Sequence, residues 1–273
     1  MTIADYENQI LQWRAEKYNN LLRENGWLAL AGLSWLKEGR NLIGSNPLCE
    51  VLLPERAPTF LGIATLKGKT VNFQVAGGVH ALVNGKLVEK IVLKSTKDSK
   101  PSYITWDEIQ LVLHEHAGRY AMRIWDNKRA ERFSLPPLKW FPINKHFRIN
   151  GRYTRYPEPK ISGQPDTLGE TIEDRLDGHV SFTFEGKKYK LDVTETKDHK
   201  LFIKFKDLTS GKESYPPSRY YYTEPVGEDG KVILDFNYAY SPPCAFTPYA
   251  TCVFAPPQNE LPFRVEAGEI YKG

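Results

Sequence analysis

Cysteine is scarce in this 273-residue sequence, which holds only Cys49, Cys244 and Cys252. An odd number at such low density excludes a disulfide framework as the main source of stability, so reduced thiols are expected. Charge of one sign is not in large excess either, because 37 Lys and Arg residues oppose 33 Asp and Glu residues. A net charge of +4 falls short of the clustered basic excess of a dedicated nucleic-acid-binding protein, and we expect no nucleic-acid partner.

Long apolar runs are missing as well. No stretch approaches the roughly 20 apolar residues that cross a bilayer, and the N-terminal residues have neither the basic segment nor the apolar core of a signal peptide. We therefore expect a cytoplasmic protein without membrane contact. Four common catalytic motifs are also absent: the Gly-x-Ser-x-Gly elbow, the Walker loop, the dinucleotide fingerprint and His-Glu-x-x-His. The sequence identifies no cofactor and does not decide whether the protein is an enzyme.

Aromatic residues, proline and glycine are plentiful. Aromatics make up 12% of the chain, with 19 prolines and 20 glycines, a balance that favours strands and ordered turns. The predicted fold class is mainly β, with an N-terminal helix, a β-sandwich, and then a second antiparallel sheet or barrel. The predicted divisions are 1–25 for the helix, 26–138 for the sandwich and 139–273 for the C-terminal module.

The helix is expected over residues 5–24. Tyr6, Ile10, Trp13 and Leu21 recur at helical spacing, which predicts one buried face. Thr2 with Asp5 resembles a capping box, and Gly26 provides a C-terminal stop. We expect this helix to pack across one of the sheets.

Between Asn41 and Trp125, short strands alternate with turn signals, including Asn84-Gly85 at a predicted hairpin. This region resembles the forkhead-associated (FHA) fold through four segments: residues 41–45, 52–54, 83–87 and 104–112. In that family, an Arg after the first glycine and a Ser-x-x-His motif bind phosphothreonine. Here Ser45 follows Gly44 and no Ser-x-x-His occurs, so the resemblance implies the fold without the phosphopeptide site. The alternative function is a non-catalytic protein or peptide interaction module that uses this sandwich.

The C-terminal module contains the most specific segment of the chain. It reads Asp-Phe-Asn at 235–237, Pro-Pro-Cys-Ala-Phe at 242–246, Tyr-Ala-Thr-Cys at 249–252 and Glu-Ala-Gly-Glu at 266–269. Together with Trp-Phe-Pro at 140–142 and Gly-Trp-Leu at 26–28, this pattern resembles a widespread prokaryotic family of uncharacterised proteins. Proline-stiffened backbone carrying clustered polar groups is typical of a pocket. A structural clasp over the chain end is the simpler alternative.

Residues 232–240 are expected to form a strand with Asp235 and Asn237 on one face, directed at a cavity or at solvent. With Tyr240, these residues would orient a small polar or anionic ligand, and Arg123 and Arg219 would contact its anionic group. Asp235, Cys244 and Glu266 are the predicted catalytic residues, if the protein acts on that ligand. Asp235 or Glu266 would be the general base.

The thiols and imidazoles permit several interpretations. Cys244 and Cys252 are most simply small buried side chains, while a nucleophile, a disulfide and a metal ligand pair are the alternatives. His114 and His116 share a strand face, but no third ligand is visible, so no metal site is predicted. The basic aromatic stretch 139–156 imitates a surface for single-stranded nucleic acid. Its rings are expected in the core instead.

Overall fold

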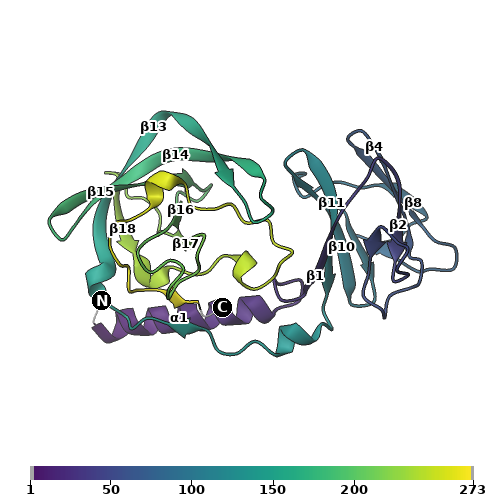
Figure 1. Ribbon diagram of the computed structural model, residues 1–273, viewed down its shortest axis with the longest axis horizontal. Coiled ribbons are helices and arrows are strands. Elements are labelled where there is room, and N and C mark those ends of the chain that lie inside the picture. The colour runs from purple at the N-terminus through teal and green to yellow at the C-terminus, as the bar shows by residue number, and fades with distance from the viewer. Residues whose placement is uncertain (1–2, 272–273) are drawn as a thin grey trace. The chain divides into compact units, whose positions relative to one another are not determined.

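The computed structural model describes residues 3–271 and divides into two compact units (Figure 1). Unit 1 joins the N-terminal residues up to Tyr18 to the chain from Pro136 onward, and unit 2 spans Asn19–Leu135. The predicted division of the chain after residues 25 and 138 remains a prediction. Mainly β architecture with one N-terminal α-helix is confirmed.

Helix α1 spans Ile3–Leu22, two residues earlier at each end than predicted. Tyr6 and Ile10 are buried, and Trp13 packs edge-on against Trp140 and Tyr238 at centroid distances of 5.6 and 5.0 Å. The helical spacing of apolar residues therefore marks a buried face, as predicted. Thr2 of the predicted capping box lies outside the described residues. Within residues 3–271, no helix combines the length and apolar character needed to span a membrane.

Unit 2 is a sandwich of two sheets around one core. The first sheet has the order β1-β11-β10-β9-β6-β7, and the second β3-β2-β4-β5-β8, in which only the β2–β3 pairing is parallel. Phe73 and Ile104 are fully buried in the shared core. The strands are β1 Leu30–Trp35, β2 Gly39–Gly44, β3 Val51–Leu52, β4 Gly62–Lys67, β5 Thr70–Val75, β6 Leu82–Val83, β7 Lys86–Leu87, β8 Lys90–Val92, β9 Tyr103–Trp106, β10 Ile109–His116 and β11 Arg119–Asp126.

Unit 2 contains a tight turn that the sequence predicts and a first strand that it does not. Asn84 and Gly85 have φ values of 49° and 79° between β6 and β7, the left-handed pair that the predicted hairpin turn requires. Residues 30–35, which precede the region of predicted strands, form strand β1 and pair with β11. Their apolar residues do not alternate with polar ones, so the period of a strand was not visible.

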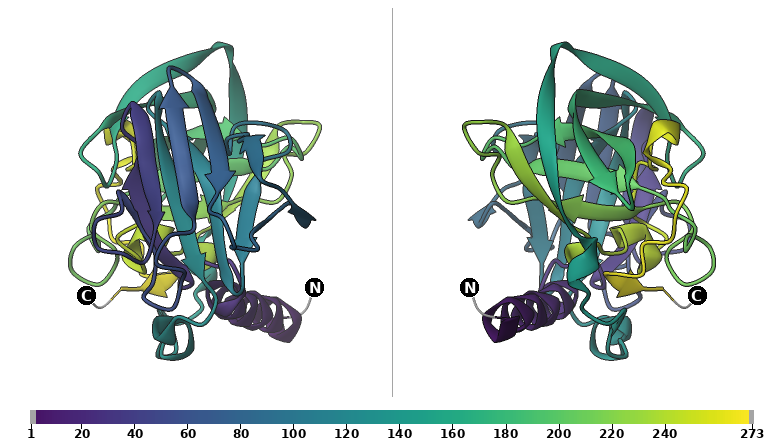
Figure 2. Two further views of the ribbon diagram at one scale, coloured as in Figure 1. Left: turned by 90° about the vertical axis from the view of Figure 1, so that its right-hand side faces the viewer. Right: turned by 90° about the vertical axis from the view of Figure 1, so that its left-hand side faces the viewer.

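Unit 1 is built on an antiparallel sheet curved into a half-barrel, with the order β17-β16-β15-β14-β13-β18 (Figure 2). Phe182, Leu191 and Ile203 are among its buried core residues. This confirms the predicted second antiparallel module. Its strands are β12 Lys139–Trp140, β13 Arg148–Pro165, β14 Thr171–Phe184, β15 Lys187–Glu195, β16 Leu201–Phe205, β17 Arg219–Tyr222, β18 Lys231–Asp235 and β19 Glu269–Ile270, of which β12 and β19 form a separate pair.

The predicted strand over 232–240 is wrong beyond Asp235. Strand β18 ends there, and Phe236–Tyr238 form a 3₁₀ turn. The Asp235 side chain caps this turn by accepting a hydrogen bond of 3.1 Å from the Asn237 amide, a local bond that competes with continuation of the strand. Both Phe236 and Asn237 are consequently buried instead of lying on opposite faces.

Candidate functional site

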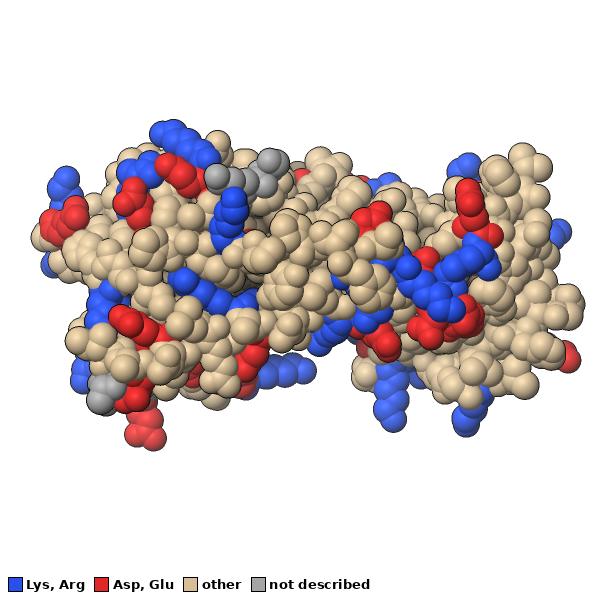
Figure 3. Space-filling view, turned by 90° about the horizontal axis from the view of Figure 1, so that it is seen from below, with Lys and Arg blue, Asp and Glu red and all other residues tan. Residues whose placement is uncertain are grey.

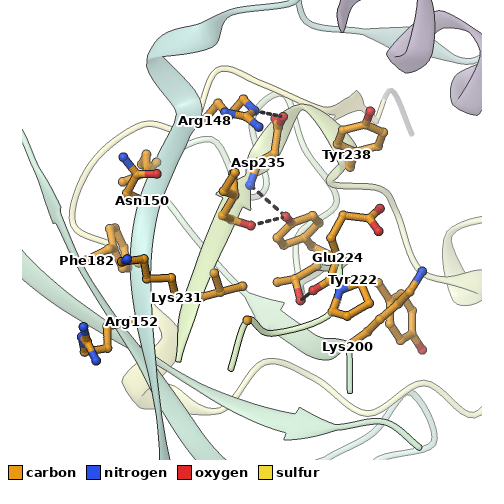
Figure 4. A pocket seen from close by; sticks show the side chains of 18 of the residues that line it. Arg148, Asn150, Arg152, Phe182, Lys200, Tyr222, Glu224, Lys231, Asp235 and Tyr238 are labelled. Atoms are coloured by element: carbon orange, nitrogen blue, oxygen red, sulfur yellow. Dashed lines mark hydrogen bonds and ion pairs between the residues drawn. The ribbon is translucent and has the colours of Figure 1, made fainter. Parts of the chain in front are cut away.

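A wide hollow of about 2010 Å³ lies in unit 1. Its lining comes from one face of α1, from β13, β14, β15 and β18, and from loop and strand residues that are Lys200, residues 221–225, Gly227, Tyr238 and Tyr240. Figure 4 shows Arg148 beside Asp235 in this hollow, with Tyr238, Tyr222 and Glu224 on the neighbouring wall. Aromatic rings from the helix and from the turn after β18 make the hollow partly apolar, a composition typical of small-molecule sites.

The lining is strongly basic. It contains seven Lys and Arg residues, which are Lys17, Arg148, Arg152, Lys188, Lys190, Lys200 and Lys231, but only two acidic residues, Glu224 and Asp235. The whole chain, with 37 basic and 33 acidic residues, is nearly balanced. The face seen in Figure 3 likewise has Lys and Arg atoms within a hollowed area. Positive charge is thus concentrated in the hollow.

Strand pairing places several of these cations side by side. Lys231 on β18 pairs with Arg152 on β13, Arg152 pairs with Ser181 on β14, and Ser181 pairs with Lys190 on β15. The three basic residues therefore form one row across the sheet. At one end of this row, Asp229 forms an ion pair of 2.5 Å with Lys231. Like charges in directly opposed positions destabilise a sheet.

Asp235 and Asn237 are the centre of a buried hydrogen-bond network. The Tyr6 hydroxyl donates to Asp235 Oδ2 at 2.8 Å, and Asn237 Nδ2 donates to Asp235 Oδ1 at 2.8 Å. Asn237 also accepts from the Asn144 amide at 2.9 Å. Arg148 Nε lies 3.6 Å from Asp235 Oδ2. Burial raises the pKa of Asp235 above its usual range, opposed by the hydrogen bonds from Asn237 and Tyr6.

Lys17 and Tyr240 form a second polar contact on the wall of the hollow. The Lys17 ammonium lies 3.2 Å from the centroid of the Tyr240 ring and 5.5 Å from that of Trp13. Burial lowers the pKa of Lys17 to about 8, and the charge of Glu269 opposes this shift. Glu269 is itself 3% exposed, accepts a hydrogen bond of 3.0 Å from the Ser241 amide, and has its pKa raised by burial to about 7.

Of the predicted site residues, Asp235 and Tyr240 line the hollow. Asn237 is fully buried and lies outside the lining, where it supports Asp235 through their hydrogen bond. The structure places the predicted arginines elsewhere. Arg219 is fully buried and donates to Asp207 at 3.0 Å, as well as to the carbonyls of Val265 and Ala267. It lies outside the lining of the hollow and holds the C-terminal segment to β17. Arg123 belongs to unit 2, where its Nη2 lies 3.1 Å from His114 Nε2.

Glu266 and Cys244 also lie outside the lining. Glu266 is exposed and forms an ion pair of 2.7 Å with Arg264. In the same Glu-Ala-Gly-Glu motif, the buried residue near Lys17 is Glu269, which is not among the residues predicted from the sequence. Cys244 is half-buried beside Cys252, whose Sγ accepts a hydrogen bond of 3.3 Å from the Cys244 amide.

Lys17 and Arg148 were missed as lining residues. Lys17 lies four residues after Trp13, and that spacing places both side chains on the same helix face. Arg148 pairs with Asp235 in the sheet. The helix signal was available in the sequence, whereas the strand register between residues 87 positions apart was not.

Unit 1 is thus a curved antiparallel half-barrel with a hollow whose lining is basic. The chain belongs to the family described as "Protein of unknown function (DUF1684)", whose model matches residues 132–270. That range includes the hollow's sheet but not α1. The chain is also similar to the solution NMR structure of an uncharacterised protein from Haloarcula marismortui, with 29% identity, 51% of this chain and 79% of that chain covered, and a TM-score of 0.42. No curated protein matches the chain.

Proposed function

We propose that unit 1 binds a small anionic molecule that carries an aromatic or other apolar part. The observation that carries this proposal is the excess of seven basic over two acidic residues in the lining of the hollow. A surface without a ligand has no need to gather like charges, because directly opposed cations, here Lys231 and Arg152, cost stability. An anion placed among them would remove that repulsion and gain charge-assisted hydrogen bonds.

Arg148 is the residue best placed to contact the anionic group. Its side chain is 40% exposed and lies at 3.6 Å from Asp235, beyond the usual length of a direct hydrogen bond. The Asp235 oxygens already accept hydrogen bonds from Tyr6 and Asn237. In this proposal Asp235 orients Arg148 and the turn after β18, while Lys17 adds a second cation from α1. The rings of Trp13, Tyr222 and Tyr238 contact the apolar part of the ligand.

A matched pair of dyes tests the proposal. Anilinonaphthalene sulfonate carries an anionic and an aromatic part, and N-phenylnaphthylamine is its uncharged counterpart. We expect the sulfonate to bind the natural chain more tightly than the uncharged dye, and Arg148→Gln to weaken sulfonate binding selectively by about tenfold, the usual value of one charge-assisted contact. Lys212→Gln is the control, because Lys212 is an exposed lysine outside the lining.

Equal binding of the two dyes, or equal effects of Arg148→Gln and Lys212→Gln, would contradict an anion site. Binding of the uncharged dye alone would indicate an apolar binding site in which the basic residues do not contact the ligand. Circular dichroism of each variant separates loss of binding from loss of fold.

A second function, docking of a protein partner, is proposed for the FHA-like sandwich of unit 2. It is supported by Leu48 and Leu87, which are 83% and 67% exposed near the predicted loop tips at Ser45 and Asn84. Exposed apolar side chains mark a partner surface where they form one contiguous patch, so this proposal requires one partner to cover both leucines. A partner captured by the natural chain should still bind Arg148→Gln but not the double variant Leu48→Ser with Leu87→Ser. Capture that is equal for all three proteins would contradict docking at these loops.

A further inference from the structure

Cys244 and Cys252 lie in contact although seven residues separate them. Cys244 belongs to the 3₁₀ turn Pro243–Ala245, and its backbone amide donates a hydrogen bond of 3.3 Å to Cys252 Sγ. The two side chains also interact closely enough that each shifts the pKa of the other. Both are free thiols. The turn that follows the two prolines therefore holds one sulfur against the other.

The two thiols have unequal environments. Cys244 is half-buried, whereas Cys252 is 7% exposed. The hydrogen bond from Cys252 lowers the pKa of Cys244, and a hydrogen bond from Tyr215 acts in the same direction against the effect of burial. The same contact and burial raise the pKa of Cys252. A more accessible thiol that ionises first, next to a buried thiol that ionises last, is the arrangement of an attacking and a resolving cysteine.

We propose that Cys244 and Cys252 form a redox-active dithiol that reduces a small hydroperoxide and becomes a disulfide. The Cys244 thiolate attacks one oxygen of the peroxide, so that an S–O bond forms and the O–O bond breaks. The leaving hydroxide takes up a proton and departs as water, and Cys244 becomes a sulfenic acid. The Cys252 sulfur then attacks Cys244, the S–S bond forms, and the hydroxyl leaves as a second water with the Cys252 proton. Two thiols lose two electrons while one hydrogen peroxide yields two waters.

A purely structural role explains this pair less well. A small apolar side chain accounts for buried Cys252, but it does not require a second, half-buried cysteine to place its backbone amide 3.3 Å from the Cys252 sulfur. The site is also separate from the anion hollow, because neither cysteine lines the hollow. A result that contradicts the binding proposal would therefore leave the redox proposal untouched, and the reverse also holds.

The test is oxidation of the full-length reduced protein by hydrogen peroxide, followed by digestion with trypsin without reductant. The stretch between Lys231 and Arg264 contains both cysteines and no other Lys or Arg, while Cys49 lies on a different peptide. We expect the 232–264 peptide to lose two hydrogen atoms. We expect this change to be at least about tenfold faster than oxidation of Cys49, because burial raises the pKa of the Cys49 thiol.

Two variants assign the roles of the cysteines. Cys252→Ser should accumulate a sulfenic acid on Cys244 that dimedone traps, and Cys244→Ser should leave Cys252 unreactive. Addition of oxygen atoms to the 232–264 peptide of the natural protein without loss of hydrogen, or oxidation no faster than that of Cys49, would overturn the proposal. The peptide measurement on the natural protein decides the matter even where a variant fails to fold.

Discussion

The Tyr6 hydroxyl donates a hydrogen bond of 2.8 Å to Asp235 across 229 residues of sequence. The same hydroxyl accepts a bond of 3.1 Å from Asn237 Nδ2. One phenol thus joins the first turns of α1 to the end of β18 and to the 3₁₀ turn after it. These three elements form one wall of the basic hollow, so the fold of the wall depends on this contact.

Tyr6→Phe is expected to destabilise unit 1. The substitution keeps the ring but leaves buried groups of Asp235 and Asn237 without their partner, which costs about 1–3 kcal/mol. The midpoint of urea unfolding measures the change. Tyr222→Phe is the control, because that side chain is 46% exposed. An equal, small effect of both substitutions would mean that the Tyr6 hydroxyl contributes nothing measurable.

Arg219→Met is expected to lower stability by about 3–5 kcal/mol, since it leaves buried Asp207 without its charged partner. Arg264→Gln, which removes two partly exposed ion pairs with Glu213 and Glu266, should cost no more than about 1 kcal/mol. Thermal unfolding compares the two variants. If Arg219 were a ligand contact, its loss would weaken dye binding by folded protein; we expect that binding to be unchanged.

Glu269 is expected to make stability depend on pH. Its pKa is raised from 4.5 to about 7 in the folded protein, so the folded state holds this proton more tightly than the unfolded state. The resulting stability is fully present below pH 4.5 and is lost as the pH rises through 7, a change of about 3 kcal/mol for this residue. Glu269→Gln should remove that decline, whereas Glu266→Gln at an exposed site should preserve it. Denaturant unfolding between pH 4 and 8 distinguishes them.

Lys17 is expected to make anion binding depend on pH. Because its pKa is lowered to about 8, the ammonium loses its proton as the pH rises through 8, and affinity for the sulfonate dye should fall there. The charge of Glu269, which develops near pH 7, acts on the same side of the hollow and should also weaken binding. Lys17→Met should bind weakly below pH 8 and lose the decline above it. An unchanged decline in this variant would assign the effect to another group.

The sequence predicted the secondary-structure elements better than it predicted the residues of the site. Local signals were sufficient for α1, where Tyr6 and Ile10 recur at helical spacing, and for the Asn84-Gly85 turn, where the required backbone conformation selects the residues. They failed after Asp235, because side-chain capping of a 3₁₀ turn competes with the strand that alternation predicts. Arg219 and Glu266 were chosen by residue type, but burial and ion pairing depend on partners elsewhere in the fold. Only the tertiary structure shows that Glu269, and not Glu266, is the buried residue near Lys17, and that Arg148 lies beside Asp235.

The most direct test of the anion hollow is a nuclear magnetic resonance titration of the isotope-labelled natural chain with anilinonaphthalene sulfonate. Binding in the hollow predicts the largest amide shift changes in three segments: residues 9–17 of α1, 148–152 of β13 and 221–224. These changes should be reduced in Arg148→Gln and retained in Lys212→Gln. Shift changes confined to residues 19–135, or spread evenly over the surface of unit 1, would contradict the assignment of this hollow as the ligand site.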